Sequence, residues 1–141
     1  MPASKEEIVT FLVEEFPQSK GVVEAVGNGR ATVSHPIGTS ELRPGGTVSG
    51  PALMTVADFA LYVAILGEIG IVPLTVTTNL TMNFLRKPPA AARIIGECTL
   101  MKVGRSLAVG EVLLYSEGST EPVAHVVGTY SIPPKREGRK D

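Results

Sequence analysis

One long apolar segment, residues 51–66, dominates the hydrophobic pattern of the chain, and Asp58 is its only charged residue. Sixteen residues of helix span about 24 Å, which is short for a membrane span, and a central carboxylate disfavours one further. The segment therefore predicts a helix that is buried on nearly all sides inside a folded domain, not a membrane helix. Gly67 is placed to end this helix.

Upstream of this segment, the pattern predicts a shorter helix and a hairpin. A Ser-x-x-Glu capping box that begins at Ser4, followed by apolar residues at helical spacing, predicts an amphipathic helix within residues 1–19. Two short strands are expected between residues 21 and 35, joined by the turn Gly27-Asn28-Gly29. Residues 36–50 are rich in proline and glycine and are expected to form a loop.

Downstream of the segment, polar and apolar residues alternate, which is typical of strands. Residues 74–84 predict one long strand with Leu80 on its apolar face and Thr77 on its polar face. Short connections favour antiparallel pairing of the strands that follow. Three such strands are expected, at about residues 92–102, 105–116 and 122–132. Residues 133–141 are polar and basic, and we expect a frayed tail.

Together these elements predict the fold class α+β, with an antiparallel sheet of five to six strands wrapped around one central apolar helix. An extra helix is expected at the N-terminus. The length of 141 residues predicts a single domain, residues 1–141. Because a sheet covers only one side of the helix, a second copy of the chain is the simplest cover for the other side. A monodisperse monomer in light scattering would contradict this expectation.

Composition and charge narrow the classes of function. Hydrophobic residues at 43% and charged residues at 19% are typical of a globular domain, and a net charge of −1 gives no reason to expect nucleic acid as a partner. We expect a cytoplasmic protein, because no signal peptide is visible and the single cysteine, Cys98, suits a reducing compartment. His35 and His125 belong to no spaced metal-binding motif, so no metal site is expected.

The apolar helix carries one polar face. Thr55, Asp58 and Tyr62 lie three and four residues apart and therefore share a side. In one interpretation, Thr55 and Tyr62 satisfy a buried carboxylate in a core or a dimer interface. In the other, Asp58 faces a cleft and acts on a bound substrate. A buried carboxylate costs several kcal/mol unless it is compensated, which makes Asp58 the first candidate for chemistry.

The start of the helix is a second candidate. The sequence Ser49-Gly50-Pro51 places a proline near the first helical position, with Ser49 or Gly50 as the cap. An amide at a helix N-terminus lies at the positive end of the dipole and can polarise a carbonyl. Gly50 has no side chain, so a substrate can approach its backbone, although relief of loop strain also explains a glycine there.

Two segments, Ser49–Asp58 and Thr75–Arg86, resemble the hotdog-fold acyl-CoA thioesterases, specifically the PaaI-like group related to phenylacetyl-CoA and hydroxybenzoyl-CoA thioesterases. The similarity extends over about residues 20–132 and includes Gly104-Arg105-Ser106 and Val127–Tyr130. Members of that group carry a His-Gly-Gly motif at the entrance to the helix. Here Ser49 replaces the histidine and Pro51 replaces the second glycine, while Gly50 retains the first.

The resemblance implies hydrolysis of an acyl-CoA to a free carboxylic acid and coenzyme A. It implies Asp58 as general base or nucleophile and Gly50 as the amide donor to the thioester oxygen. Thr77 stands where some relatives position water, and Arg43 stands where relatives contact substrate through an amide side chain. The side chains expected around the substrate also include Ser49, Thr55 and Tyr62. No cofactor is implied beyond the coenzyme A of the substrate. The family also implies a homodimer or tetramer with active sites between subunits.

Coenzyme A carries phosphates, which cations near a surface groove bind. The candidates for this contact are Arg86, Lys87, Arg105 and Ser106, which also fit ordinary solvated surface positions. Two other functions remain open. The altered His-Gly-Gly motif allows a non-catalytic acyl-CoA-binding protein. A hotdog hydratase or dehydratase is less favoured, because such enzymes pair a histidine with the carboxylate and none lies near this helix.

Overall fold

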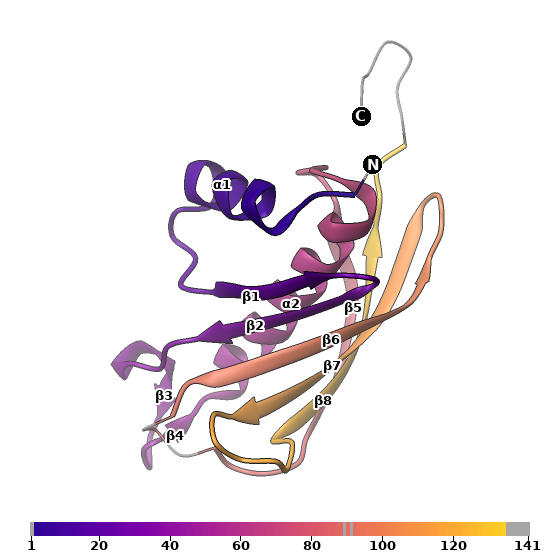
Figure 1. Cartoon of the computed structure of the whole chain (residues 1–141). Coiled ribbons are helices and arrows are strands. Elements are labelled where there is room, and N and C mark those ends of the chain that lie inside the picture. Colours follow the sequence, from indigo (N-terminus) through magenta and orange to yellow (C-terminus); the bar gives the residue numbers. More distant parts are fainter. Residues whose placement is uncertain (1, 89, 91, 135–141) are drawn as a thin grey trace.

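In a computed structural model, which describes residues 2–88, 90 and 92–134, one antiparallel sheet of six strands wraps around the apolar helix α2 (Figure 1). The strand order is β1-β2-β6-β7-β8-β5, so β5 is an edge strand. This confirms the predicted α+β architecture and the hotdog fold. The elements are α1 (Lys5–Glu15), β1 (Val22–Gly27), β2 (Arg30–His35), the 3-10 turn η1 (Thr39–Glu41), β3 (Leu42–Arg43), β4 (Thr47–Val48), α2 (Gly50–Ile69), β5 (Val76–Phe84), β6 (Ile94–Val103), β7 (Leu107–Ser116) and β8 (Ala124–Ser131).

The N-terminal helix α1 begins at the predicted capping box. The Ser4 hydroxyl accepts a hydrogen bond from the Glu7 amide at 3.1 Å, and the Glu7 carboxylate accepts one from the Ser4 amide at 2.9 Å. The apolar face of α1 buries Ile8 and Leu12, and the helix packs on α2 and β1 (Figure 1). Of the predicted tail 133–141, residues 135–141 lie outside the described residues.

The prediction that Gly67 ends the apolar helix is wrong. Helix α2 continues to Ile69 and ends at Gly70, whose φ of 95° is the conformation that glycine tolerates best. Gly67 is instead a buried helical residue, and a Cβ there would lie 2.5 Å from the Val26 side chain on β1. This glycine therefore allows α2 and β1 to pack closely. The residues next to Gly67 in the sequence do not reveal this contact.

Residues 36–50 contain more structure than the loop that the sequence predicts. They include the turn η1 and a two-stranded hairpin of β3 and β4, in which Arg43 pairs with Thr47. Gly45 and Gly46 supply positive φ angles of 101° and 80° at the hairpin turn. Strands of two residues are too short to show a hydrophobic period, so the pattern could not reveal them.

Strand β5 contains a bulge that changes which side chains face α2. The pairing with β8 shifts register between Thr77 and Asn79, so Thr77 lies opposite Tyr130 while Leu80 lies opposite Gly128. Cross-strand partners point to the same side of a sheet, and one extra residue reverses the alternation. The predicted placement of Thr77 and Leu80 on opposite faces is therefore wrong, because both face α2.

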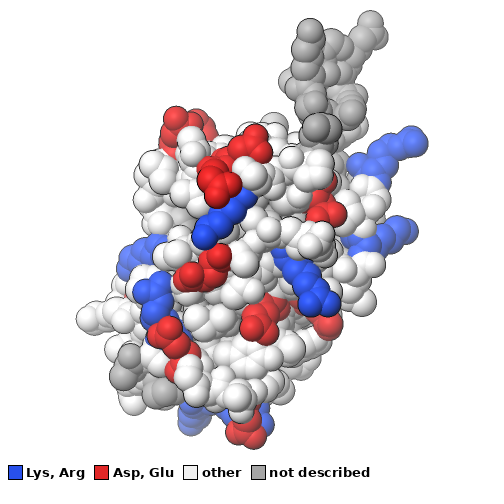
Figure 2. Space-filling view, in the orientation of Figure 1, with Lys and Arg blue, Asp and Glu red and all other residues white. Residues whose placement is uncertain are grey.

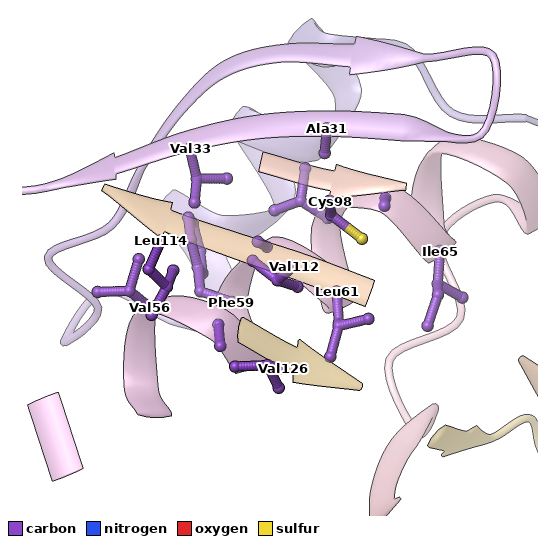
Figure 3. Close-up of a cluster of buried hydrophobic side chains, with 14 of the residues drawn as sticks. Ala31, Val33, Val56, Phe59, Leu61, Ile65, Cys98, Val112, Leu114 and Val126 are labelled. Carbon is purple, nitrogen blue, oxygen red and sulfur yellow. The ribbon is translucent and has the colours of Figure 1, made fainter. Parts of the chain in front are cut away.

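The core lies between α2 and the concave side of the sheet (Figure 3). Leu61 is fully buried at its centre, and glycines at positions 110 and 128 leave room for its methyl groups. By length and composition α2 could cross a membrane, but 61% of its most apolar window is buried within this domain. The packing supports the predicted core helix.

Replacing Leu61 with Ala is expected to lower the free energy of unfolding by about 3–4 kcal/mol, since the neighbouring glycines cannot fill the vacated space. Urea denaturation measures this loss. The control is Val13→Ala on α1, where the side chain is 67% exposed and a change below about 0.5 kcal/mol is expected. Equal effects of the two substitutions would contradict the placement of Leu61 at the centre of the core.

Candidate active site

A cavity of about 880 Å³ opens between α1, the middle of α2 and the start of β5. Its size is within the range of small-molecule binding sites. Five of the seven phenylalanine and tyrosine residues of the chain line it, which gives the cavity an apolar, aromatic wall. The aromatic lining residues are Phe11, Phe16, Phe59, Tyr62 and Tyr130. The polar lining residues include Asp58 and Thr77, and also Lys20, His35 and Glu41.

Two hydroxyl groups hold the Asp58 carboxylate in the wall of this cavity. Thr77 Oγ1 and Tyr130 OH each donate to Asp58 Oδ1 at 2.6 Å. The Tyr130 hydroxyl also lies 3.0 Å from the Asp58 backbone carbonyl, which fixes the tyrosine against the helix. Asp58 Oδ2 has no hydrogen-bond partner within the described part of the chain. One carboxylate oxygen is thus anchored, and the other remains available to a ligand or to water.

Tyr130 is the functional candidate that the sequence analysis missed. Its side chain is only 2% exposed, and burial together with the adjacent Asp58 carboxylate raises the pKa of Tyr130 far above its ordinary value. The hydroxyl therefore stays protonated and acts as a donor toward Asp58. A buried tyrosine needs a hydrogen-bond partner, so its position on an inward face of the last strand was the available signal.

The other residues of the polar helix face have more structural roles. Thr55 lines the cavity, but its hydroxyl donates to the Pro51 carbonyl at 3.1 Å. Tyr62 donates to the Pro73 carbonyl at 3.3 Å, and its ring stacks on Tyr130 with centroids 6.1 Å apart. Burial also raises the pKa of Tyr62. Of the predicted helix-face residues, Asp58 is the only carboxylate, and its Oδ2 has no hydrogen-bond partner in the described part of the chain.

The helix N-terminus is built as the sequence predicts, with Ser49 as the cap. Its hydroxyl accepts a hydrogen bond from the Ala52 amide at 3.2 Å. The Gly50 amide has no acceptor among residues 2–88, 90 and 92–134, and a Cβ at Gly50 would lie 3.2 Å from the Phe84 ring. Asp58 lies eight positions after Gly50 in the helix, which is about 12 Å at 1.5 Å per residue. Neither Ser49 nor Gly50 lines the Asp58 cavity.

A second polar group lines the same cavity. Glu41 is buried and accepts hydrogen bonds from the Gly38 amide, the Ser40 hydroxyl and the Lys20 ammonium, the last at 3.0 Å. These donors, the Gly38 amide first, lower the pKa of Glu41 to about 2. His35 is also buried there. The residues around His35 in the sequence give no functional signal, because only the fold brings this histidine to the cavity.

The residues predicted to contact coenzyme A form two groups that lie far from each other. Arg86 follows β5, donates to the Pro122 carbonyl and pairs with Glu121 at 3.5 Å, and the exposed Lys87 is its neighbour. Arg105 and Ser106 form the exposed turn between β6 and β7, where Ser106 accepts from the Ile132 amide. These groups lie at opposite ends of β8, about 25 Å apart at 3.3 Å per residue. Within one chain they cannot bind the same phosphate.

Arg43 lies in β3, is exposed and does not line the Asp58 cavity. Charges of both signs are interspersed over the face shown in Figure 2, without a large basic patch. No group of three or more His, Cys, Asp or Glu side chains that could hold a metal ion occurs in the described ranges. The structure thus brings Asp58, Thr55, Tyr62 and Thr77 together and leaves the other predicted site residues elsewhere.

The chain is similar to known proteins in both sequence family and structure. Residues 45–123 match the model of the thioesterase superfamily. A crystal structure of a candidate thioesterase from Silicibacter sp. is 42% identical to this chain, with 93% of this chain and 92% of that chain covered and a TM-score of 0.85. A search of curated protein sequences gave no match.

More distant structures share the fold. A mutant of the phenylacetic acid degradation protein PaaI from Thermus thermophilus is 24% identical, over 88% of this chain and 99% of that chain, with a TM-score of 0.72. A protein from Streptococcus mutans, solved with acetyl-CoA bound, is 19% identical over 84% of this chain and 92% of that chain, with a TM-score of 0.70.

Proposed function

Since the chain belongs to the thioesterase superfamily, we propose that it hydrolyses an acyl-CoA to a carboxylic acid and coenzyme A. The observation that carries the proposal is the free Oδ2 of Asp58 in an aromatic cavity, with Oδ1 held by Thr77 and Tyr130. The acetyl-CoA bound to the Streptococcus mutans protein supports an acyl-CoA as the class of ligand.

The anchored carboxylate suits either of two reaction paths. As general base, Asp58 Oδ2 takes a proton from water while the water oxygen attacks the thioester carbonyl. As nucleophile, Oδ2 attacks the carbonyl itself, and water then hydrolyses the resulting anhydride. In both paths the carbon–sulfur bond breaks and the coenzyme A thiolate takes up a proton. Both paths also need a donor for the negative charge that develops on the thioester oxygen.

We propose that this donor is Gly50 of the partner subunit in a homodimer. A thioester carbonyl within reach of Asp58 lies too far from the Gly50 amide of the same helix, about 12 Å away along the axis. Strand β5 is an edge strand with exposed apolar side chains, including Val76 at 52% and Phe84 at 56%. When two copies pair through this edge about a two-fold axis perpendicular to β5, the two β5 strands run antiparallel.

Antiparallel pairing brings the start of one β5 next to the end of the other. Thr77, which donates to Asp58 on α2, lies near the start of β5. Phe84 lies at the end of β5 and packs against Gly50. The same arrangement brings Arg105 of one subunit toward the partner's Arg86. The turn that contains Arg105 lies beside the end of β8 that pairs with the start of β5, whereas Arg86 follows the end of β5. The dimer therefore assembles groups that a single chain keeps apart.

An acyl-CoA panel tests the proposed activity. Release of coenzyme A thiol, measured with a chromogenic disulfide, is expected for at least one short, medium-chain or aromatic acyl-CoA. Saturable binding of every tested acyl-CoA without thiol release would instead establish a non-catalytic acyl-CoA-binding protein. Appearance or loss of a double bond in the acyl group, followed by mass spectrometry, would point to a hydratase or dehydratase.

Replacing Tyr130 with Phe is expected to lower kcat about tenfold with little change in KM, because the carboxylate loses one of the two donors that orient it. Initial rates on the best acyl-CoA measure the effect. Tyr62→Phe is the matched control, since that hydroxyl donates only to the Pro73 carbonyl and a change below about twofold is expected. An equal loss in both variants would assign Tyr130 a packing role only.

A further inference from the structure

A second groove, here called the α1 groove, lies between α1 and the loop that follows α2. Its volume is about 630 Å³. Three of its lining residues, Phe11, Ile71 and Pro73, are apolar, and Ile71 is 38% exposed. No lysine or arginine of the described residues lines it, whereas four carboxylates do, namely Glu6, Glu7, Glu14 and Glu15. The α1 groove therefore combines exposed apolar surface with a local negative charge.

The carboxylates of the α1 groove lack cationic partners within the described part of the chain. Glu7 accepts a hydrogen bond from the Ser4 amide, and none of the four forms an ion pair there. Glu14 and Glu15 lie in the last turn of α1, which contains no basic residue. The helix dipole is negative at that end, so a cation is favoured there and two carboxylates are not. The groove therefore suits a cationic occupant.

The chain itself contains a basic segment that follows β8. Residues 135–141 lie outside the described residues, and their sequence contains four basic and two acidic side chains. Ser131, the last residue of β8, pairs with Val76, which is three positions after Pro73 of the α1 groove. Figure 1 shows that β8 ends on the same side of the molecule as the end of α2. The basic segment thus starts near the groove.

The groove is within reach of this segment. The ring of Tyr62 lies 6.1 Å from the ring of Tyr130 on β8 and 6.5 Å from the ring of Phe11 on α1, measured between centroids. One aromatic ring therefore separates β8 from the α1 groove. Lys135 is five positions after Tyr130, and an extended chain of that length spans about 17 Å. The residues after Pro134 can reach the groove while β8 stays paired.

We propose that the basic segment 135–140 docks in the α1 groove of the same chain, where its cations pair with the α1 carboxylates. Its covalent attachment to β8 gives it a high effective concentration at the groove. Phe11, Glu15 and Pro73 line both the α1 groove and the Asp58 cavity. The docked segment therefore holds α1 in place as a wall of that cavity. This inference does not depend on the proposed thioesterase activity.

Hydrogen exchange of the full-length protein tests whether the segment holds α1. Changing its four basic residues together to glutamine is expected to speed amide exchange in α1 about fivefold, since several weak exposed ion pairs are lost. The residues changed are Lys135, Arg136, Arg139 and Lys140. Sodium chloride at about 0.5 M should have the same effect on the wild type, because salt screens such pairs. Exchange in β6 should not change. Unchanged exchange in α1 under both conditions would overturn the proposal.

A spin label attached to Gly138→Cys identifies the occupant. The native Cys98 is buried, and burial raises the pKa of its thiol to about 12, so labelling is confined to position 138. The label is expected to broaden the amide NMR signals of α1 in the same chain. Broadening only between an isotope-labelled copy and a spin-labelled copy would assign the groove to a second copy and overturn docking within one chain. Absence of broadening in α1 would overturn the docking itself.

A matched pair of double variants tests the charges of the groove. Glu6→Gln with Glu14→Gln removes two carboxylates of the α1 groove and should abolish the broadening of α1. Glu97→Gln with Glu117→Gln makes the same change in net charge at two exposed positions outside the groove, and the broadening should remain. Equal broadening in the two double variants would refute recognition of the segment by the α1 carboxylates.

Discussion

Asp58→Asn is expected to lower kcat for the best acyl-CoA by about 10³-fold with little change in KM. The asparagine oxygen can still accept from Thr77 and Tyr130, so the side chain keeps its place. An amide in the position of Oδ2 can neither take a proton from water nor attack a thioester. The loss therefore reports chemistry and not binding, and thiol release under saturating substrate measures it.

Two measurements make the Asp58 result decisive. The melting temperature of Asp58→Asn should stay close to that of the wild type, and acyl-CoA affinity by calorimetry should be retained. A variant that keeps both properties and full turnover would remove Asp58 from the mechanism. Incorporation of oxygen-18 from labelled water into Asp58, in a single turnover of the wild type, then identifies the nucleophilic path, because a carboxylate that acts only as a base does not acquire the label.

Gly50→Pro is expected to lower kcat by about 10²–10³-fold, the usual effect of losing one oxyanion donor. Proline lacks the amide hydrogen and is favoured in the first turn of a helix. Ser49 already has the extended backbone that a following proline requires, with φ −72° and ψ 155°. The matched control is Gly50→Ala, which retains the amide and asks only for a small shift of the Phe84 ring.

Mixing the two inactive variants tests where the site is assembled. Unfolding and refolding equal amounts of Asp58→Asn and Gly50→Pro produces mixed dimers. If Gly50 serves the partner's Asp58, each mixed dimer contains one intact site, and activity recovers to about a quarter of wild type. If both residues act within one chain, every chain is defective and the mixture stays inactive.

Much of the fold could be predicted from the sequence because it rests on long periodic patterns. The apolar run around Asp58 indicated a core helix, and the alternation after Pro73 indicated the strands. The errors fall where a tertiary contact overrides local pattern. Gly67 was expected to end α2, but it serves close packing against Val26 on β1. The short β3–β4 hairpin carries no period at all.

The candidate site could be predicted only in part, for a related reason. Helical spacing brings Thr55, Asp58 and Tyr62 together, and this cluster follows from the sequence alone. The partners of Asp58 depend on strand pairing. Thr77 reaches the carboxylate because a bulge in β5 reverses the alternation, and Tyr130 arrives from a strand 72 residues away. A single sequence does not show which residues of β5 and β8 pair, or which of them reach α2.

The part of the cavity wall that α1 and β2 contribute comes earlier in the chain than the residues proposed to carry the chemistry. Gly50, Asp58 and Thr77 fall within the segment shared with the superfamily, whereas Phe11 and His35 precede it. Natural divergence or a mutant library confined to the first 44 positions can therefore change which acyl groups are accepted while the hydrolytic groups stay untouched. Such a protein is a convenient starting point for directed evolution of new thioester preferences.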